Sequence, residues 1–135
     1  MSDIFCKIAN GEIPSTKVYE DDDVLAFLDL SQTTLGHTLV IPKKHYTNIL
    51  DADDETIAKV FKVARNIGNS LMKMGAKGVN ILSNANEVAG QSVFHFHVHV
   101  LPRYGNDENL VIAFKEHDTS SLDLKALAEK IQENL

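Results

Sequence analysis

The sequence is poor in the residues that mark secreted and membrane proteins. Its 135 residues include one cysteine, no tryptophan and no unbroken apolar run longer than five residues. One cysteine cannot form a disulfide within the chain, and the first residues show no basic segment followed by a long apolar one. A membrane span needs about 20 apolar residues. The sequence therefore predicts a cytoplasmic protein that does not enter a membrane.

Basic residues are also few. The chain carries 13 basic and 19 acidic side chains, which gives a net charge of −6, and its largest basic cluster is the pair Lys43 and Lys44. Binding to a nucleic-acid polymer needs many Lys and Arg contacts with phosphates. The composition argues against that class of partner and favours a small anionic ligand held by local donors.

What remains is the composition of one globular domain. Hydrophobic residues make up 44% and charged residues 24% of the chain. The length and the absence of repeats or linkers predict a single domain over residues 1–135. Short apolar and β-branched runs around one long periodic segment predict an α+β fold with a mainly antiparallel sheet of about five strands. The expected strands cover residues 17–20, 24–28, 37–41, 79–83 and 93–101.

Two helices are expected. Apolar residues recur at helical spacing from Ile57 to Met74, with Asp51 as a plausible N-cap and Gly75 as a stop. A final helix would be capped by Ser120 or Ser121. Residues 110–114 could form a short segment before it. The three aspartates at 21–23 lack the Gly and the later Glu of a calcium loop and predict a solvated hairpin turn.

Three alternating histidines are the most informative feature. His95, His97 and His99 fall within a run whose other members are apolar, from Phe94 to Val100. Side chains on a strand alternate between faces, so the histidines would form a row about 6.6 Å apart, with the apolar residues facing a core. A plain solvent-facing strand would bring Lys, Thr or Glu instead.

Two chemistries use such a row. Imidazoles on one face can bind a zinc ion. Neutral imidazole is also a nucleophile, and its neighbours can donate protons to a phosphoryl oxygen or a leaving group. Gly90, Gln91 and Ser92 lead into the row and supply backbone and hydroxyl donors that suit phosphate, which favours the second chemistry. A fourth histidine, His37, opens another expected strand and could equally be a chance surface residue.

Residues 90–101 resemble the His-φ-His-φ-His-φ-φ signature of the histidine-triad (HIT) nucleotide-binding proteins, where φ is apolar. Residues 4–8, 12–14, 25–29 and 36–45 resemble the small one-domain Hint branch and its bacterial relatives. The resemblance implies a HIT-like fold and a homodimer whose sheet continues across the interface. It also implies hydrolysis at the α-phosphorus of purine nucleoside phosphoramidates or related adenylates, through a covalent nucleotidyl-histidine and without a required cofactor.

The resemblance also implies roles for individual residues. His97 would be the nucleophile, and His99 would contact the phosphate and assist proton transfer. His95 and His37 would complete a hydrogen-bonded network that orients His97, and Ser92 would donate toward the leaving group. A related group with uridylyltransferase activity carries Gln in place of His99, so His99 points to hydrolysis.

Nucleotide contacts follow from the same resemblance. Asp29 would accept hydrogen bonds from the ribose, and its place directly after an apolar strand agrees with that role. The base would meet apolar walls that could equally be ordinary core residues. The implied nucleotide-binding residues are Asp29, Asn84, Gln91, Ser92, His99, Ile4, Phe5, Ile8, Phe27 and Leu30.

One motif departs from the resemblance. Many bacterial relatives bind zinc through a Cys-x-x-Cys pair and two histidines, whereas the matching pair here is Asp3 and Cys6. Asp can ligate zinc, so Asp3, Cys6, His45 and His95 could still form a structural site weakened by the loss of one thiolate. Cys6 could otherwise be a small buried residue.

The sequence thus favours a nucleotide hydrolase whose ligand is a purine mononucleotide or nucleoside phosphoramidate. Two alternatives stay open at this point. The pocket could serve only to sense nucleotides, with incidental turnover. The histidine row could instead hold one catalytic zinc ion.

Overall fold

A computed structural model describes residues 3–107 and 109–135. Among these residues, no helix combines the length and the apolar character needed to cross a membrane. The elements follow the chain as α1 (Ile4–Ala9), β1 (Lys17–Glu20), β2 (Val24–Leu28), β3 (Thr38–Pro42), α2 (Asp54–Lys73), β4 (Gly78–Leu82), the 3-10 helix η1 (Glu87–Ala89), β5 (Val98–Arg103) and α3 (Leu124–Glu133).

The five strands form one antiparallel sheet in the order β1-β2-β3-β5-β4. This confirms the predicted α+β class. The turn between β1 and β2 is the predicted aspartate turn: one carboxylate oxygen of Asp21 accepts from the backbone N–H groups of Asp23 and Val24, both at 2.8 Å. Since β3 and β5 are neighbours, residues 37–40 and 97–100 lie side by side in the middle of the sheet.

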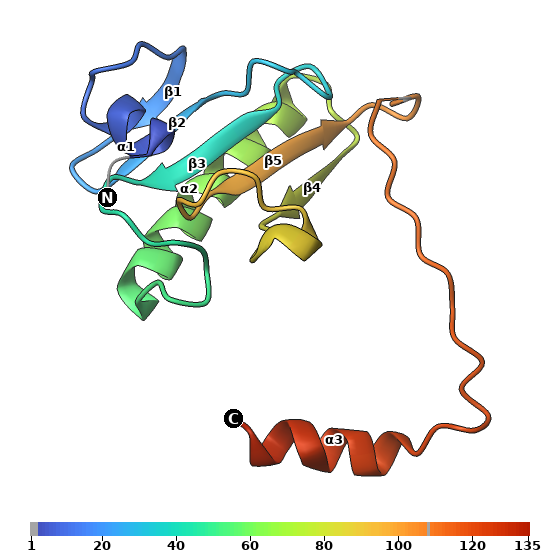
Figure 1. Cartoon of the computed structure of the whole chain (residues 1–135). Coiled ribbons are helices and arrows are strands. Elements are labelled where there is room, and N and C mark those ends of the chain that lie inside the picture. The colour runs from blue at the N-terminus through green and yellow to red at the C-terminus, as the bar shows by residue number, and fades with distance from the viewer. Residues whose placement is uncertain (1–2, 108) are drawn as a thin grey trace.

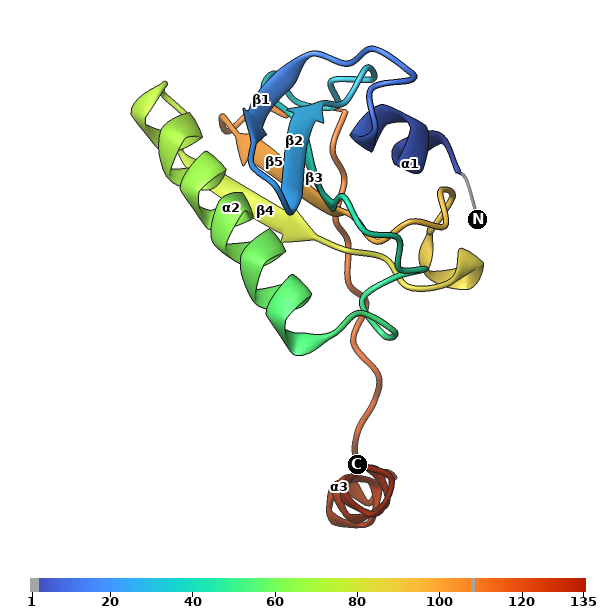
Figure 2. The same ribbon diagram turned by 90° about the vertical axis from the view of Figure 1, so that its left-hand side faces the viewer.

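The sheet carries a different helix on each face. In Figure 2, α2 covers one face and α1 lies on the other. Side-chain alternation builds two cores: Val40, Val98 and Val100 pack toward α2, whereas Leu39 and Ile41 pack with Phe5 and Ile8 of α1 and its neighbours. The face that carries α1 therefore also receives the side chains next to Val98, which are histidines.

The long helix is confirmed, but its start was predicted two residues too early. Asp53 is the N-cap and accepts from Thr56 N–H at 2.7 Å. Asp51 instead accepts from the N–H groups of Thr47 and Asn48, which closes the preceding turn. Similarly, the final helix is capped by Asp123 and not by Ser120 or Ser121. A short polar side chain caps whichever backbone N–H groups lie closest.

The fifth strand begins five residues later than predicted. Before Val98 the chain bonds to other partners: Phe96 N–H donates to Tyr46 O at 2.7 Å, and the Gln91 amide donates to the carbonyl oxygens of Thr47 and Val93. Because these bonds replace a strand ladder, Phe94 does not join the core as predicted and is 45% exposed.

Residues 111–135 form a C-terminal arm that was not foreseen. The predicted segment at 110–114 has no regular secondary structure, and every residue from Val111 to Leu135 is exposed. In Figure 1 this arm leaves the body beyond β5 and carries α3 well away from the sheet.

Candidate active site

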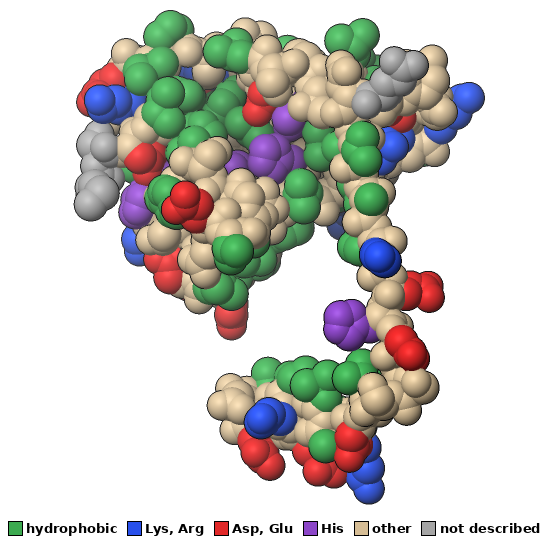
Figure 3. All heavy atoms as spheres, turned by 45° about the vertical axis from the view of Figure 1, so that its right-hand side comes forward, with side chains coloured by type: hydrophobic (Ala, Val, Ile, Leu, Met, Phe, Trp, Pro, Cys, Tyr) green, Lys and Arg blue, Asp and Glu red, His purple; other side chains and the backbone are tan. Residues whose placement is uncertain are grey.

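A hollow of about 290 Å³ lies on the α1 face of the sheet and gathers the histidines of β5 and the start of β3. Figure 3 shows histidine side chains exposed within it, among apolar ones. Because β3 and β5 are paired, with Leu39 opposite His99, the two strands bring His37 beside His99. The hollow is lined by Phe5, Asp29, Thr33, His37, Leu39, Leu82, Asn84, Gly90, Ser92, Val93, His97, His99, Leu101 and Leu110.

His97 is held in one tautomer. Its Nδ1 lies 2.7 Å from the backbone carbonyl oxygen of His95. A carbonyl oxygen only accepts, so Nδ1 carries the proton and Nε2 keeps its lone pair. The backbone at His97 is fixed as well, because Ser83 Oγ donates to its carbonyl oxygen at 2.7 Å. Burial lowers the pKa of His97, although the bond to His95 acts in the opposite direction, so the ring is neutral at neutral pH.

His99 and His37 share one hydrogen bond. His99 Nδ1 and His37 Nε2 are 2.9 Å apart, and His37 Nδ1 is buried without a hydrogen-bond partner. Asp29 Oδ2 lies 3.9 Å from His37 Nε2 and attracts a proton to that nitrogen. We therefore assign the shared proton to His37 Nε2, because a proton on Nδ1 would leave a buried donor unpaired. His99 then carries its own proton on Nε2.

The same hollow keeps His99 uncharged. Burial, followed by the neighbouring His97 and His37, lowers the pKa of His99 to about 4. Burial likewise lowers the pKa of His37. The ring centroids of His97 and His99 are 5.1 Å apart. The arrangement thus sets the Nε2 lone pair of His97 beside the Nε2–H donor of His99, with neither ring positively charged at neutral pH.

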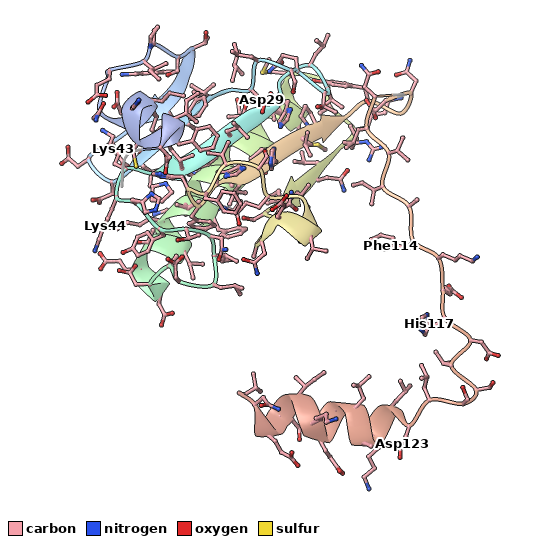
Figure 4. The ribbon with its side chains drawn as sticks, in the orientation of Figure 1. Asp29, Lys43, Lys44, Phe114, His117 and Asp123 are labelled. Carbon is pink, nitrogen blue, oxygen red and sulfur yellow. The ribbon has the colours of Figure 1, made fainter. Side chains whose placement is uncertain are left out.

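Asp29 stands at the end of β2, at the upper rim of the sheet in Figure 4. Burial alone would raise the pKa of its carboxyl group, but hydrogen bonds from Ser31 and the nearby His37 outweigh burial and lower it. Ser31 occupies Oδ1, so Oδ2 is the oxygen that faces the histidines. Asp29 is therefore an ionised acceptor at the edge of the hollow.

The sequence-predicted contacts divide into two groups. Phe5, Asn84 and Ser92 line the hollow. Asn84 lies against Gly90, where a Cβ would come within 3.2 Å of Asn84 Nδ2 and the φ of +101° disfavours other residues. These positions support the expectation that this loop approaches a ligand closely.

The other predicted contacts lie elsewhere. Ile4 and Leu30 are exposed, and Ile8 and Phe27 pack in the core under α1. Gln91 points inward: its amide is buried and bonds the loop backbone, which leaves no free donor for a ligand. Gln91 lies in an irregular loop, where a side chain can face inward or outward. Its position just before the histidine motif could not predict which of the two directions it takes.

Several lining residues were missed by sequence reasoning. Leu39 and Leu101 follow His37 and His99 by two positions, so they share a strand face with them. That alternation could have predicted both. Thr33 and Leu110 lie in irregular segments that no periodicity signals.

A second cluster surrounds His95, outside this hollow. Its Nδ1 lies 3.2 Å from Asp3 Oδ2 and 3.3 Å from Cys6 Sγ. His45 Nδ1 lies 2.9 Å from the same Asp3 oxygen and 3.5 Å from Cys6 Sγ. All four ligand atoms lie within 4.8 Å of one another. His95 therefore contacts the His97 ring through its backbone carbonyl oxygen, whereas its own ring faces this cluster.

These four side chains fit a zinc ion. One thiol, two imidazoles and one carboxylate at these spacings suit a tetrahedral structural site. His95 Nε2 lies 2.8 Å from Pro42 O and must donate its proton there, so Nδ1 is left as a lone pair aimed at the cluster. Asp3 Oδ1 accepts from Cys6 N–H at 2.7 Å, which caps α1 and leaves Oδ2 for the cluster.

The three histidines of the row do not gather around one ion. Within residues 3–107 and 109–135, the groups of metal-ligand atoms are the Asp3 cluster and a set of Asp29, His37 and His99, and neither contains His97. Two backbone carbonyl oxygens explain why His95 and His97 face different sites. Pro42 O binds the Nε2 side of the His95 ring, and His95 O binds the Nδ1 side of the His97 ring. The alternative of a single three-histidine metal centre has no support in this geometry.

Comparisons with known proteins agree with the fold and the motif. The HIT domain family model matches residues 10–106. A crystal structure of a HIT family member from Bacillus subtilis has 45% identity and a TM-score of 0.93, with coverage of 100% of this chain and 98% of that one. The adenosine 5′-monophosphoramidase of Schizosaccharomyces pombe is 35% identical over 100% of this chain and 99% of its own length.

A third similar protein contains zinc in its crystal structure. The crystal structure of a Zn-bound histidine triad family protein from Mycobacterium smegmatis has 35% identity and a TM-score of 0.77, and covers 100% of this chain and 99% of that one. The domain match, the whole-chain likeness and the histidine signature lead to one conclusion: this chain belongs to the HIT domain family.

Proposed function

We propose that the protein hydrolyses purine nucleoside 5′-phosphoramidates and related adenylates at the α-phosphorus, with His97 as the nucleophile. One observation carries this proposal: the 2.7 Å bond from His97 Nδ1 to the His95 carbonyl oxygen. That bond leaves Nε2 of a buried, neutral imidazole as a lone pair in the hollow. A lone pair fixed in this way can attack phosphorus without first losing a proton.

The first chemical step follows from this arrangement. His97 Nε2 forms a bond to phosphorus, and the bond from phosphorus to the leaving amine breaks. The amine must leave protonated, and His99 Nε2–H is the donor beside His97. The hydrogen-bonded pair of His99 and His37 takes up one proton from solvent when the anionic substrate binds, so the pair becomes neutral as it gives this proton to the amine, and no imidazolate forms. The nitrogen of the leaving amine takes that proton with the electron pair of the broken bond. The hydrogen bond from His37 Nε2–H to His99 Nδ1 keeps the His99 ring oriented.

The second step returns the enzyme to its starting state. Water attacks phosphorus, its proton passes to His99 Nε2, and the bond to His97 breaks. The products are the nucleoside monophosphate and neutral His97. Donors around a partly dry hollow stabilise the phosphoryl charge in both steps more than they would in water.

The nucleotide would be held by the rest of the hollow. Asp29 is an ionised acceptor suited to the ribose hydroxyls, and Asn84 and Ser92 are donors suited to phosphate oxygens. Phe5, Leu39 and Leu101 provide the apolar surface for a base. The name of the fission yeast relative supports an adenosine phosphoramidate as the first substrate to test.

We also infer that Asp3, Cys6, His45 and His95 hold a structural zinc ion. The fit of their donor atoms and the Zn-bound relative support this site. The ion would join α1 to the segment that carries His95 and would supply no step of the reaction. Its role would be to stabilise the packing of α1, since the backbone bonds of Phe96 and His97 hold the segment that orients His97 without the ion.

We further propose a homodimer in which the sheet continues from one copy to the next. Among the described strands, β4 pairs only with β5, so its other edge is open. β4 carries no charged residue, and Ile81 and Leu82 are exposed on it. An open, uncharged edge favours pairing with another strand.

AMP release from adenosine 5′-phosphoramidate tests the proposed reaction. We expect turnover by the natural chain with or without a strong chelator, and none by His97→Ala, while that variant still binds AMP. An active His97→Ala would contradict the nucleophile assignment. Tight AMP binding without turnover of any phosphoramidate would favour a nucleotide-sensing module instead.

A further inference from the structure

The C-terminal arm, residues 111–135, has no packing partner among residues 3–107 that would explain its structure. Its residues are all exposed, and the hydrogen bonds found along it join residues at most four positions apart. Figures 1 and 2 both show α3 standing clear of the body. In Figure 4, Phe114 and His117 likewise lie on the extended stretch, away from the sheet.

α3 is an amphipathic helix whose apolar side is exposed. Leu124, Leu127, Ala128 and Ile131 recur at helical spacing and form one apolar stripe, whereas Glu129 and Glu133 lie on the opposite side. Figure 3 shows apolar side chains gathered along the side of α3 that faces the body. An isolated helix of 10 residues is marginal in water. Packing of this stripe against another surface would therefore supply its stability.

The arm begins where a second copy would sit. It follows β5, whose last residue, Arg103, is paired with Gly78 at the start of β4. The open edge of β4 is therefore next to the root of the arm. A copy paired along that edge would lie beside the extended stretch, within reach of α3.

The opposite edge of the sheet differs. β1 carries the ion pair Lys17–Glu20 at 2.8 Å, and charged side chains on an edge oppose strand pairing. The arm and the pairing-competent edge thus share one side of the molecule.

The extended arm also recurs in a crystal structure. The Bacillus subtilis relative superimposes over the whole of this chain. The arm makes up 25 of the 135 residues, so such a high TM-score requires that it stand away from the body there too. An exposed apolar helix kept in the same detached place in two proteins indicates a surface that each chain lacks by itself.

We propose that the arm is exchanged between two copies of this chain. The apolar stripe of α3 packs on the second copy, which places its own α3 on the first by two-fold symmetry. This proposal rests on the homodimer proposed above, but not on the hydrolysis.

Light scattering with size-exclusion chromatography on the full chain tests the exchange. We expect the mass of two 14.9 kDa chains. The double variant Leu127→Gln and Ile131→Gln keeps good helix formers but removes the stripe, and we expect its dimer dissociation constant to rise about 100-fold or more. Glu129→Gln with Glu133→Gln alters the other side of α3 and should dimerise like the natural chain.

A cross-link then identifies what α3 touches. Unlabelled chain with a photoreactive phenylalanine at Leu124 is mixed with ¹⁵N-labelled natural chain, unfolded and refolded together. We expect cross-linked peptides that join unlabelled and labelled chains. A monomeric natural chain, a stripe variant that dimerises normally, or cross-links confined to one chain would each overturn the exchange. None of these results depends on catalysis.

Discussion

His95 and His97 are two residues apart, yet their rings serve different surroundings. The His95 ring donates from Nε2 to Pro42 O and aims Nδ1 at Asp3 and Cys6. The His97 ring donates from Nδ1 to His95 O and keeps Nε2 for the hollow. Each ring is fixed by one backbone carbonyl oxygen, but through the opposite nitrogen.

The difference shows how one motif can support two functions. Which nitrogen meets a carbonyl decides which lone pair remains, and so decides where metal binding or nucleophilic attack can occur. His95 is fully buried beside a carboxylate and a thiol, which suits a metal. His97 faces His99 in a hollow open to a ligand, which suits attack on phosphorus.

Removing one imidazole from each cluster should give the largest contrast. We expect His99→Ala to lower turnover of adenosine 5′-phosphoramidate by about 10²–10⁴-fold, because the donor to the leaving amine is lost. His45→Ala, in the metal cluster, should keep turnover within a few fold and lower zinc content. Steady-state rates and metal analysis of both variants check this. Equal losses of rate would break the separation of the two clusters.

Neutralising Asp29 should weaken nucleotide binding more than chemistry. A hydrogen bond to a charged acceptor is worth about 1.5–3 kcal/mol, so we expect Asp29→Asn to raise KM by about 10–100-fold. Asp23→Asn is a control, because Asp23 pairs with Lys59 of α2 and does not line the hollow. Titration with AMP measures the affinity. An unchanged affinity would remove Asp29 from the ribose site.

The metal cluster should respond to its sulfur ligands. We expect Cys6→Ser to weaken zinc binding at least about tenfold, and Asp3→Cys to strengthen it, because thiolates are the preferred ligands of structural zinc. Competition with a chromophoric chelator measures both affinities. Since Asp3 also caps α1, Asp3→Cys should cost about 1 kcal/mol in the metal-free protein. Identical affinities in all three proteins would argue against this site.

Acid should destabilise the protein before its carboxylates titrate. The pKa of His99 is about 4 in the folded chain and near 6.5 when unfolded. The unfolded chain therefore binds more protons below pH 6.5, and stability falls as pH falls toward 4. Allowing for partial exposure, we expect a loss of about 1–2 kcal/mol from pH 7 to 5. Urea unfolding measures it, and His99→Gln should lose less over that range.

The sequence predicts the parts of the molecule that rest on repeating patterns. The period of Val60, Ala64, Ile67 and Leu71 locates α2, and alternation places His97 and His99 on one face. Local periodicity cannot predict α1, which has six residues and depends on the Asp3 cap and on packing of Phe5 and Ile8.

The early half of the histidine segment shows the same limit. It departs from a strand because its backbone groups bond elsewhere. Phe96 N–H donates to the carbonyl oxygen of Tyr46, which is distant in sequence, and Val93 O accepts from the side chain of Gln91, which lies in an irregular loop. Bonds of that kind depend on tertiary structure, so neither the inward turn of Gln91 nor the separation of His95 from His97 could be read from spacing. In the arm, local periodicity does predict the helix α3. The position of α3 away from the sheet depends on tertiary structure and was not predictable.

The stereochemical course at phosphorus tests the proposed mechanism most directly. An adenosine 5′-phosphoramidate analogue made chiral at phosphorus with sulfur and oxygen isotopes would be hydrolysed, and the configuration of the product determined. Attack by His97 followed by attack by water inverts the centre twice, so we expect net retention. Net inversion would mean that water attacks directly and would contradict a covalent nucleotidyl-His97.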